Sequence, residues 1–134
     1  MINTLATLRT FLAAQSALTD LTGARIWAGR TYPPQGYKPS DGAAVVFNGR
    51  GGSGLEIGGR LLRDSVQFKC YAADPISAFS LYGVLVEVLH DATSVEIHSA
   101  QLEIAGQLLT EPEPVGWPFV LAFFEVIFDS QLGA

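Results

Sequence analysis

The sequence predicts an α+β fold, a mostly antiparallel sheet of about four to five strands flanked by two helices, with a long flexible hairpin loop. Three observations predict this class. Segments in which apolar and polar residues alternate, the period of a half-buried strand, outnumber segments with helical spacing. The links between most of these segments are of hairpin length, which favours antiparallel neighbours. The 134 residues, 49% of them hydrophobic, fit one domain spanning residues 1–134.

The N-terminal part is predicted to hold a helix, a helical turn and a short strand. Asn3 can cap a helix that runs to about Gln15, because its apolar residues recur at spacings of three and four. A second short turn, 16–22, stops at Gly23, a residue suited to a left-handed C-cap. A short strand then precedes the segment 31–42, whose prolines and glycines predict a loop.

A hairpin with a glycine-rich tip is predicted next. The apolar run 43–47 is bounded by turn residues, and 62–72 alternates between apolar and polar side chains, so we expect the two to pair. Between them, residues 49–59 contain six glycines. Because ordering so many glycines is entropically costly, we expect a mobile, projecting loop there.

The clearest helix start in the chain is Asp74-Pro75, because the carboxylate caps free amides and proline needs no donor at the first helical position. The helix should run to about His90. Its apolar residues form two stripes, one with Ile76, Phe79, Val86 and Leu89 and the other with Leu81, Leu85 and Val88. A helix that is apolar nearly all round must be covered on both sides. We therefore expect one side to pack on the sheet and the stripe of Leu81, Leu85 and Val88 to form a subunit interface.

The C-terminal part is predicted to complete the sheet. Residues 94–98 and 101–109 alternate, with a bulge at Ala105-Gly106. Prolines in the segment 111–114 interrupt the ladder. The last strand, 119–129, is apolar on almost its whole surface, which predicts a strand that is central or covered twice.

Charge is divided unevenly along the chain. The first 69 residues hold all eight Lys and Arg beside four acids, a net charge of +4, whereas the remainder holds nine acids and no base. Either these charges mix on the surface of one domain, or copies of the chain meet head to tail, the basic face of one against the acidic face of the next. The sequence leaves both interpretations open. A duplex-binding role fits poorly with a net charge of −5.

No motif predicts a catalytic, cofactor or metal site. Residues 49–54 match G-x-G-x-x-G, but no helix or βαβ unit follows, so we expect no dinucleotide site. His90, Glu96 and His98 are too few and too scattered for a metal site. Cys70 is expected to pack as a small buried hydrophobe. We therefore predict a protein that is not an enzyme, with no cofactor and no metal.

One catalytic alternative stays open, a carboxylate pair formed by Glu111 and Glu113, although the neighbouring prolines favour a stiff exposed connector. We expect no signal peptide, and the longest apolar run, 119–124, is too short to span a bilayer. The single cysteine excludes an internal disulfide, and a reducing cytoplasm fits best.

The order of these features carries a family resemblance. Its components are the leucine-rich start, 5–21, the segment Gly23-Ala24-Arg25-Ile26-Trp27, the proline-bearing loop and short strand, 33–47, the hairpin tip, 49–59, and the return from Val66-Gln67-Phe68 to Asp74-Pro75-Ile76. In this order the chain resembles, over nearly its whole length, the small tail-terminator or tail-completion proteins of long-tailed bacteriophages.

The resemblance implies a structural virion protein without catalysis, a minor tail protein that serves head-tail joining. Such proteins form a hexameric ring on the head-proximal end of the tail tube, stop tube polymerisation and present a surface to the head connector. The implied partners are further copies of the chain, the major tail tube protein and the head-completion or connector protein, with transient passage of DNA through the ring and no membrane. The implied location is the tail of the virion, after synthesis in the cytoplasm of the host bacterium.

The glycine-rich loop and its base are the expected contact with the tube or with DNA. The residues expected to make this contact are Arg50, Leu55, Glu56, Ile57, Arg60 and Arg63.

Two alternatives remain at this point. A head-completion or neck protein of the connector would follow the same logic with a different neighbour. A small dimeric α+β domain would instead bind a ligand in a pocket between the helix 75–90 and the sheet. The mass in solution separates a ring from a compact dimer.

Overall fold

The computed structural model describes residues 3–51, 54–56, 61–112 and 115–129. Its elements are α1 (Thr4–Ala13), α2 (Ser16–Thr22), β1 (Ile26–Ala28), the 3-10 turn η1 (Pro39–Asp41), β2 (Ala44–Gly49), β3 (Gly54–Glu56), β4 (Leu61–Tyr71), α3 (Pro75–Leu89), β5 (Ile97–Thr110) and β6 (Pro118–Asp129).

The strands form one mixed sheet in the order β1-β2-β4-β6-β5, and β3 pairs with β4. All neighbours are antiparallel except β1 and β2. This confirms the predicted α+β class with a mostly antiparallel sheet. The parallel pair arises because the long connection 29–43 carries the chain back to the starting end of β1 before β2 begins.

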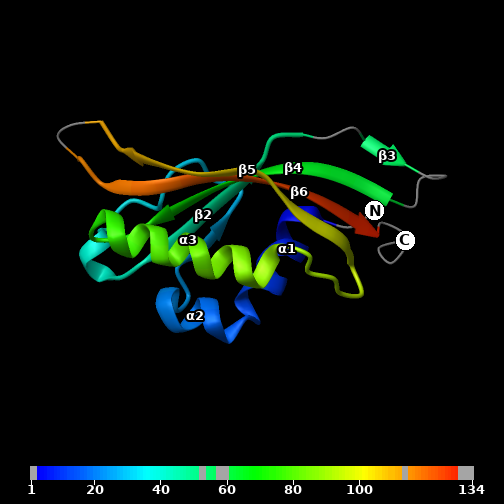
Figure 1. The fold of residues 1–134 in the computed structure, drawn as a ribbon, viewed down its shortest axis with the longest axis horizontal. Coiled ribbons are helices and arrows are strands. Elements are labelled where there is room, and N and C mark those ends of the chain that lie inside the picture. The colour runs from blue at the N-terminus through cyan, green and yellow to red at the C-terminus, as the bar shows by residue number, and fades with distance from the viewer. Residues whose placement is uncertain (1–2, 52–53, 57–60, 113–114, 130–134) are drawn as a thin grey trace.

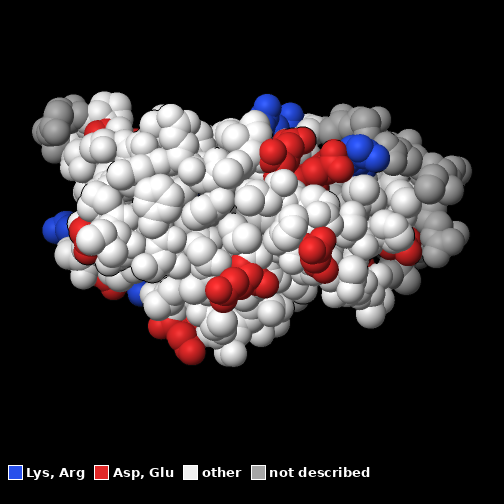
Figure 2. Space-filling view, in the orientation of Figure 1, with Lys and Arg blue, Asp and Glu red and all other residues white. Residues whose placement is uncertain are grey.

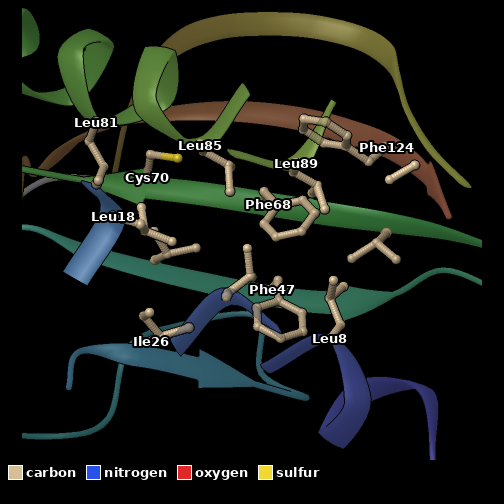
Figure 3. Packing of buried hydrophobic residues seen from close by; sticks show 14 of the residues in the cluster. Leu8, Leu18, Ile26, Phe47, Phe68, Cys70, Leu81, Leu85, Leu89 and Phe124 are labelled. Atoms are coloured by element: carbon tan, nitrogen blue, oxygen red, sulfur yellow. The ribbon is translucent and has the colours of Figure 1, made fainter. Parts of the chain in front are cut away.

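All the described helices lie on one face of the sheet (Figure 1). α3 contacts β4, β5 and β6, whereas α1 contacts β1 and α2 lies between α1 and α3. The main core fills the space between this helical layer and the sheet. Its largest fully buried side chains include Leu8, Leu18, Phe47, Phe68, Leu85 and Phe124, which come from both layers (Figure 3).

The predicted helix starts are confirmed. Asn3 Oδ1 accepts a hydrogen bond from Ala6 N at 3.0 Å, and Asp74 Oδ1 accepts one from Ser77 N at 2.9 Å. These bonds satisfy amides that have no partner inside the helix. α1 ends at Ala13 rather than near Gln15, because the backbone of Gln15 is extended and begins α2.

The second face of the sheet is partly covered by a smaller aromatic core. The loop 29–43 folds over it and inserts Tyr37, which is 7% exposed and packs edge-on against Trp27 and Trp117. Tyr71 and Lys69, expected on the polar face of their strand, are therefore buried, with 0% and 9% of their surface exposed.

The hairpin of β2 and β4 confirms the predicted pairing and extends beyond it. After β2 ends, Arg50 N donates to Ser65 O and Ser65 N donates to Gly51 O, and β3 then pairs with the start of β4. The prediction of a projecting loop is therefore wrong for residues 54–56, whose backbone joins the ladder. Residues 52–53 and 57–60 of that loop lie outside the described residues.

The C-terminal strands explain the shape of the sheet. The predicted segment 101–109 and the end of the segment 94–98 belong to one strand, β5, because irregularities in its pairing with β6 absorb the breaks in alternation. Residues 94–96, predicted as part of a strand, precede it. One register shift falls between Ile104 and Gln107, which confirms the predicted bulge. β6 lies between β4 and β5, as its apolar composition predicted, so β5 is left as a free edge.

Candidate assembly surfaces

The apolar stripe that α3 exposes differs from the one that the sequence predicted to be exposed. Leu81 and Leu85 are 1% and 0% exposed and pack in the main core, so they are not available to another subunit (Figure 3). Val88 is half-buried against the same core. The prediction of an interface on these residues is wrong for Leu81 and Leu85. The side of α3 that faces away from the sheet carries Ile76 and Phe79, which are 81% and 43% exposed.

The sequence did contain a signal for this orientation. The outward side of α3 continues from Ile76 and Phe79 through Ser80 and Gly83 to Glu87, so it is interrupted by small and polar residues. The inward side has no such interruption, because Ala78, Leu81, Leu85 and Leu89 follow one another at helical spacing. A count of apolar residues on each side does not separate the two, but the position of Glu87 does.

An uncharged surface spans the N-terminal half of α3 and the C-terminal half of β5. Phe79 packs edge-on against Tyr82, and Tyr82 Oη accepts a hydrogen bond from Gly106 N at 2.8 Å. Two residues further along β5, Leu108 is 38% exposed. Figure 2 shows this region as a broad area without charged side chains.

Acidic side chains lie beside this uncharged surface. Glu87 and Asp91 are exposed, and neither α3 nor β5 contains a Lys or Arg. Asp91 Oδ1 accepts a hydrogen bond from Gln101 Nε2 at 2.7 Å, and His90 Nε2 lies 3.6 Å from Asp91 Oδ2. Red side chains accordingly appear over the C-terminal half of α3 in Figure 2. We call the uncharged and acidic parts together the α3–β5 face, defined by Ile76, Phe79, Tyr82, Glu87, Asp91 and Leu108.

Glu103 of β5 lies on the second face of the sheet instead. Its Oε1 accepts a hydrogen bond from the Ser65 hydroxyl at 3.1 Å, and Ser65 alternates along β4 with Val66 and Phe68, which point into the main core.

The opposite edge of the sheet carries arginines. Arg9 Nε donates to Ile26 O at 3.0 Å, Arg25 Nε donates to Ala43 O at 2.9 Å, and Arg30 Nε donates to Tyr32 O at 3.1 Å. Within the part of the chain that the structure describes, no carboxylate forms an ion pair with any of the three. We call this surface the β1 edge, defined by Arg9, Arg25 and Arg30. Four strand spacings of about 4.8 Å separate β1 from β5, so the two surfaces are roughly 19 Å apart across the sheet.

Two of the residues predicted to contact the tube or DNA share the second face of the sheet. The Arg50 guanidinium lies over the ring of Phe123, 4.4 Å from its centre, and Arg63 Nη1 lies 3.2 Å from Glu125 Oε2. Leu55 and Glu56 belong to β3. Ile57 and Arg60 lie outside the described residues.

A pocket of about 510 Å³ lies between the loop segment 32–37 and the segment 111–117, on the second face of the sheet. Among the described residues, its walls are largely aromatic and proline side chains, together with the acidic Glu111. Glu111 Oε1 accepts a hydrogen bond from Tyr71 Oη at 2.6 Å and lies 3.9 Å from Lys69 Nζ. Burial, together with this hydrogen bond, raises the pKa of Tyr71 above its ordinary value.

This pocket differs from the one that the ligand-binding alternative required. The space between α3 and the sheet is filled by Leu81, Leu85 and Leu89 (Figure 3). The aromatic pocket could not be predicted from the sequence, because its walls come from two segments without regular periodicity. The carboxylate pair suggested as an alternative rests on Glu113, which lies outside the described residues, while Glu111 is held by Lys69 and Tyr71.

Among the described residues, the remaining candidates for catalytic or metal-binding residues form no such site. Cys70 is fully buried, and burial raises the pKa of its thiol to about 12, so it is a packing residue as predicted. Among the described residues, no three His, Cys, Asp or Glu side chains converge as metal ligands. No helix in the same segments is long and apolar enough to cross a membrane.

Comparison with known proteins finds a similarity in fold to a solved structure. No protein-family model and no curated protein matches the sequence. Among solved structures, the fold is similar to a chain in a structure described as the virion of a native gene transfer agent particle. The TM-score is 0.66 at 12% sequence identity, and the match covers 96% of this chain and 99% of the other. At this identity the match concerns the fold alone, and it extends over the whole of it.

Proposed function

We propose that this chain is a structural virion protein, without catalysis, that forms a hexameric ring as the tail terminator at the head-proximal end of a phage tail tube. The observation that carries the proposal is the likeness in fold to a virion chain over 96% of this chain and 99% of that one. The resemblance of the sequence to tail-terminator proteins supports the same role.

The charge distribution supports assembly of copies into a ring. A ring requires two different surfaces on each subunit, because each copy must bind one neighbour on each side. The α3–β5 face and the β1 edge are two such surfaces, opposite in charge and at opposite edges of one sheet.

Within this proposal, the extended β2–β4 hairpin contacts the tail tube. Arg50 and Arg63 lie on one face of the sheet beside it, at the base of the segment that also holds Leu55, Glu56, Ile57 and Arg60. Their guanidinium groups can pair with acidic side chains of tube subunits or with phosphates of passing DNA. The ring would stop tube growth by occupying the surface to which the next tube subunit binds, and its other side would receive the connector.

The test is a tube polymerisation assay with the tail tube protein of the same virion. Adding the purified chain should shorten the tubes and leave a ring at one end, visible in negative-stain images. Arg50→Glu should reduce this effect, whereas Lys38→Glu, an equal change in charge on the turn η1, should not. Tubes of unchanged length would contradict the proposal. Binding to the connector alone would instead assign the chain to the neck of the particle as a head-completion protein.

A second candidate function, binding of a small uncharged ligand, is favoured by the aromatic pocket, whose volume of about 510 Å³ falls in the range of ligand sites. Trp117 lines this pocket. A fluorescence titration of the two tryptophans against a fragment library would report such a ligand, and a compact dimer in solution would favour this function over the ring.

A further inference from the structure

We propose that the α3–β5 face of one copy binds the β1 edge of the next copy. This inference deepens the proposed function, because it names the two surfaces through which the ring would close. The contact itself requires only copies of this chain, so it is tested without any tail component.

Charge complementarity is the first argument. The α3–β5 face presents the carboxylates of Glu87 and Asp91, and the β1 edge presents the guanidinium groups of Arg9, Arg25 and Arg30. Each arginine uses its Nε to hold a backbone carbonyl, which fixes the base of the guanidinium and leaves the Nη groups to bind a carboxylate. No carboxylate of the described residues pairs with these groups within the chain.

Among the described residues, no Lys or Arg forms an ion pair with Glu87 or Asp91. Asp91 is approached by His90 and by the amide of Gln101. The opposed surface of a second copy is therefore the available source of fixed positive charge.

Exposed apolar side chains form the second argument. Beside its acids, the α3–β5 face exposes Ile76, Phe79 and Leu108. On the β1 side, Leu21 of α2 is 43% exposed and Trp27 of β1 is half-buried. An apolar centre with charged groups at its margin is the usual composition of a protein–protein interface.

The positions of the two surfaces determine the symmetry of the contact between copies. A two-fold contact through the α3–β5 face would set Glu87 and Asp91 against their own copies, which like-charge repulsion opposes. A contact between opposite edges avoids this and leaves a free surface at each end of any pair. Repeated contacts of this kind close into a ring or continue as a filament.

The experiment uses two complementary variants of the full chain. In the first, Glu87→Arg and Asp91→Asn make the α3–β5 face basic, and in the second, Arg9→Glu and Arg30→Glu make the β1 edge acidic. Association is measured by sedimentation equilibrium at low salt, with Lys38→Glu as a control for a change in net charge. Circular dichroism checks that each variant is folded.

Each double variant alone should associate about tenfold or more weakly than the original chain, because its two surfaces then carry the same charge. The mixture should recover association to within about threefold, because the reversed face of one variant matches the reversed edge of the other in an alternating assembly. If a charge-reversed variant does not fold, the neutral changes Glu87→Gln with Asp91→Asn, and Arg9→Gln with Arg30→Gln, should still weaken association.

Two results would overturn the inference. One is an original chain that stays monomeric at low salt up to about 1 mM, which corresponds to a negligible contact. The other is a mixture that associates no better than its separate components. The tail role is tested separately. A mixture that assembles but does not shorten tubes would support this contact and contradict the tail role. Tube capping that is unchanged in each variant alone would support the tail role and contradict this contact.

Discussion

At the scale of single residues, the buried group of Tyr71, Glu111 and Lys69 shows how the second face of the sheet tolerates charge. The Glu111 and Lys69 side chains are only 10% and 11% exposed, and the Tyr71 hydroxyl completes their contacts. Tyr71→Phe should therefore lower the free energy of unfolding by about 1–2 kcal/mol, because a buried carboxylate loses a hydrogen-bond donor. Tyr32→Phe is the matched control, since Tyr32 is 60% exposed. Urea unfolding of both variants tests this, and equal losses would contradict it.

A second residue, Asp64, predicts a dependence of stability on pH. Burial raises the pKa of Asp64 above its ordinary value of 3.8, against the opposing effect of the Ser65 and Gly51 amides, and its Oδ1 is buried without a hydrogen-bond partner in the described segments. As the pH rises from 3.8 through the raised pKa, the unfolded chain releases this proton first. Ionisation of Asp64 therefore costs stability at higher pH, and the native state gains nothing from its charge.

Asp64→Asn removes this titration. The difference in unfolding free energy between the variant and the original chain should shift in favour of the variant as the pH rises above 3.8, and then level off once Asp64 is ionised in both states. Chemical unfolding at a series of pH values measures this difference. A difference that is constant over the same range would show that the folded state does not raise the pKa of Asp64.

At the scale of elements, two glycines allow the packing of α3 on β5 to be tested, one at the contact between the two elements and one on the outer surface of α3. A Cβ built on Gly106 would lie 2.6 Å from Val120 Cγ1 and 2.8 Å from the ring of Tyr82, whereas one on Gly83 would meet nothing within 4 Å. Gly106→Ala should destabilise the fold by about 1–3 kcal/mol through overpacking, and Gly83→Ala should stabilise it by up to about 1 kcal/mol through helix propensity. Thermal unfolding of the pair tests this, and the reverse order would mean that α3 does not lie on β5 as described.

The elements also show what the sequence alone could predict. The helix start at Asp74, the hairpin of β2 and β4 and the central position of β6 follow from local rules, because capping, alternation and apolar content act within one segment. The outward side of α3 and the cover over Tyr71 depend on other segments. Either stripe of α3 could have faced the sheet on apolar content, and Tyr71 is buried only because the loop 29–43 brings Tyr37 over the sheet.

At the scale of the whole molecule, the division of charge along the chain is a division in space only at the edges of the sheet. The basic β1 edge and the acidic side chains of α3 lie at opposite edges because β4 and β6 are inserted between β2 and β5 in the sheet order. In the middle of the sheet the charges of the two halves mix, since Arg63 pairs with Glu125 and Lys69 with Glu111. Periodicity could not supply this arrangement, because it depends on which strands pair.

The proposed contact between copies combines charged and apolar groups, and these should respond differently to salt. Charges at the margin act mainly on the association rate and are screened at high ionic strength, whereas burial of an apolar side chain acts on the dissociation rate and is little changed by moderate salt. Glu87→Gln should therefore weaken association at about 0.05 M salt and have little effect at about 0.5 M. Ile76→Ser should weaken it about five- to tenfold at both, because an aliphatic side chain no longer leaves water. Val95→Ser is the matched control, since Val95 is 79% exposed but lies outside the α3–β5 face.

Sedimentation equilibrium at the two salt concentrations measures all three variants. An effect of Val95→Ser as large as that of Ile76→Ser would mean that apolar association does not use the α3–β5 face. A salt-independent effect of Glu87→Gln would mean that its carboxylate has no charged partner on the neighbouring copy.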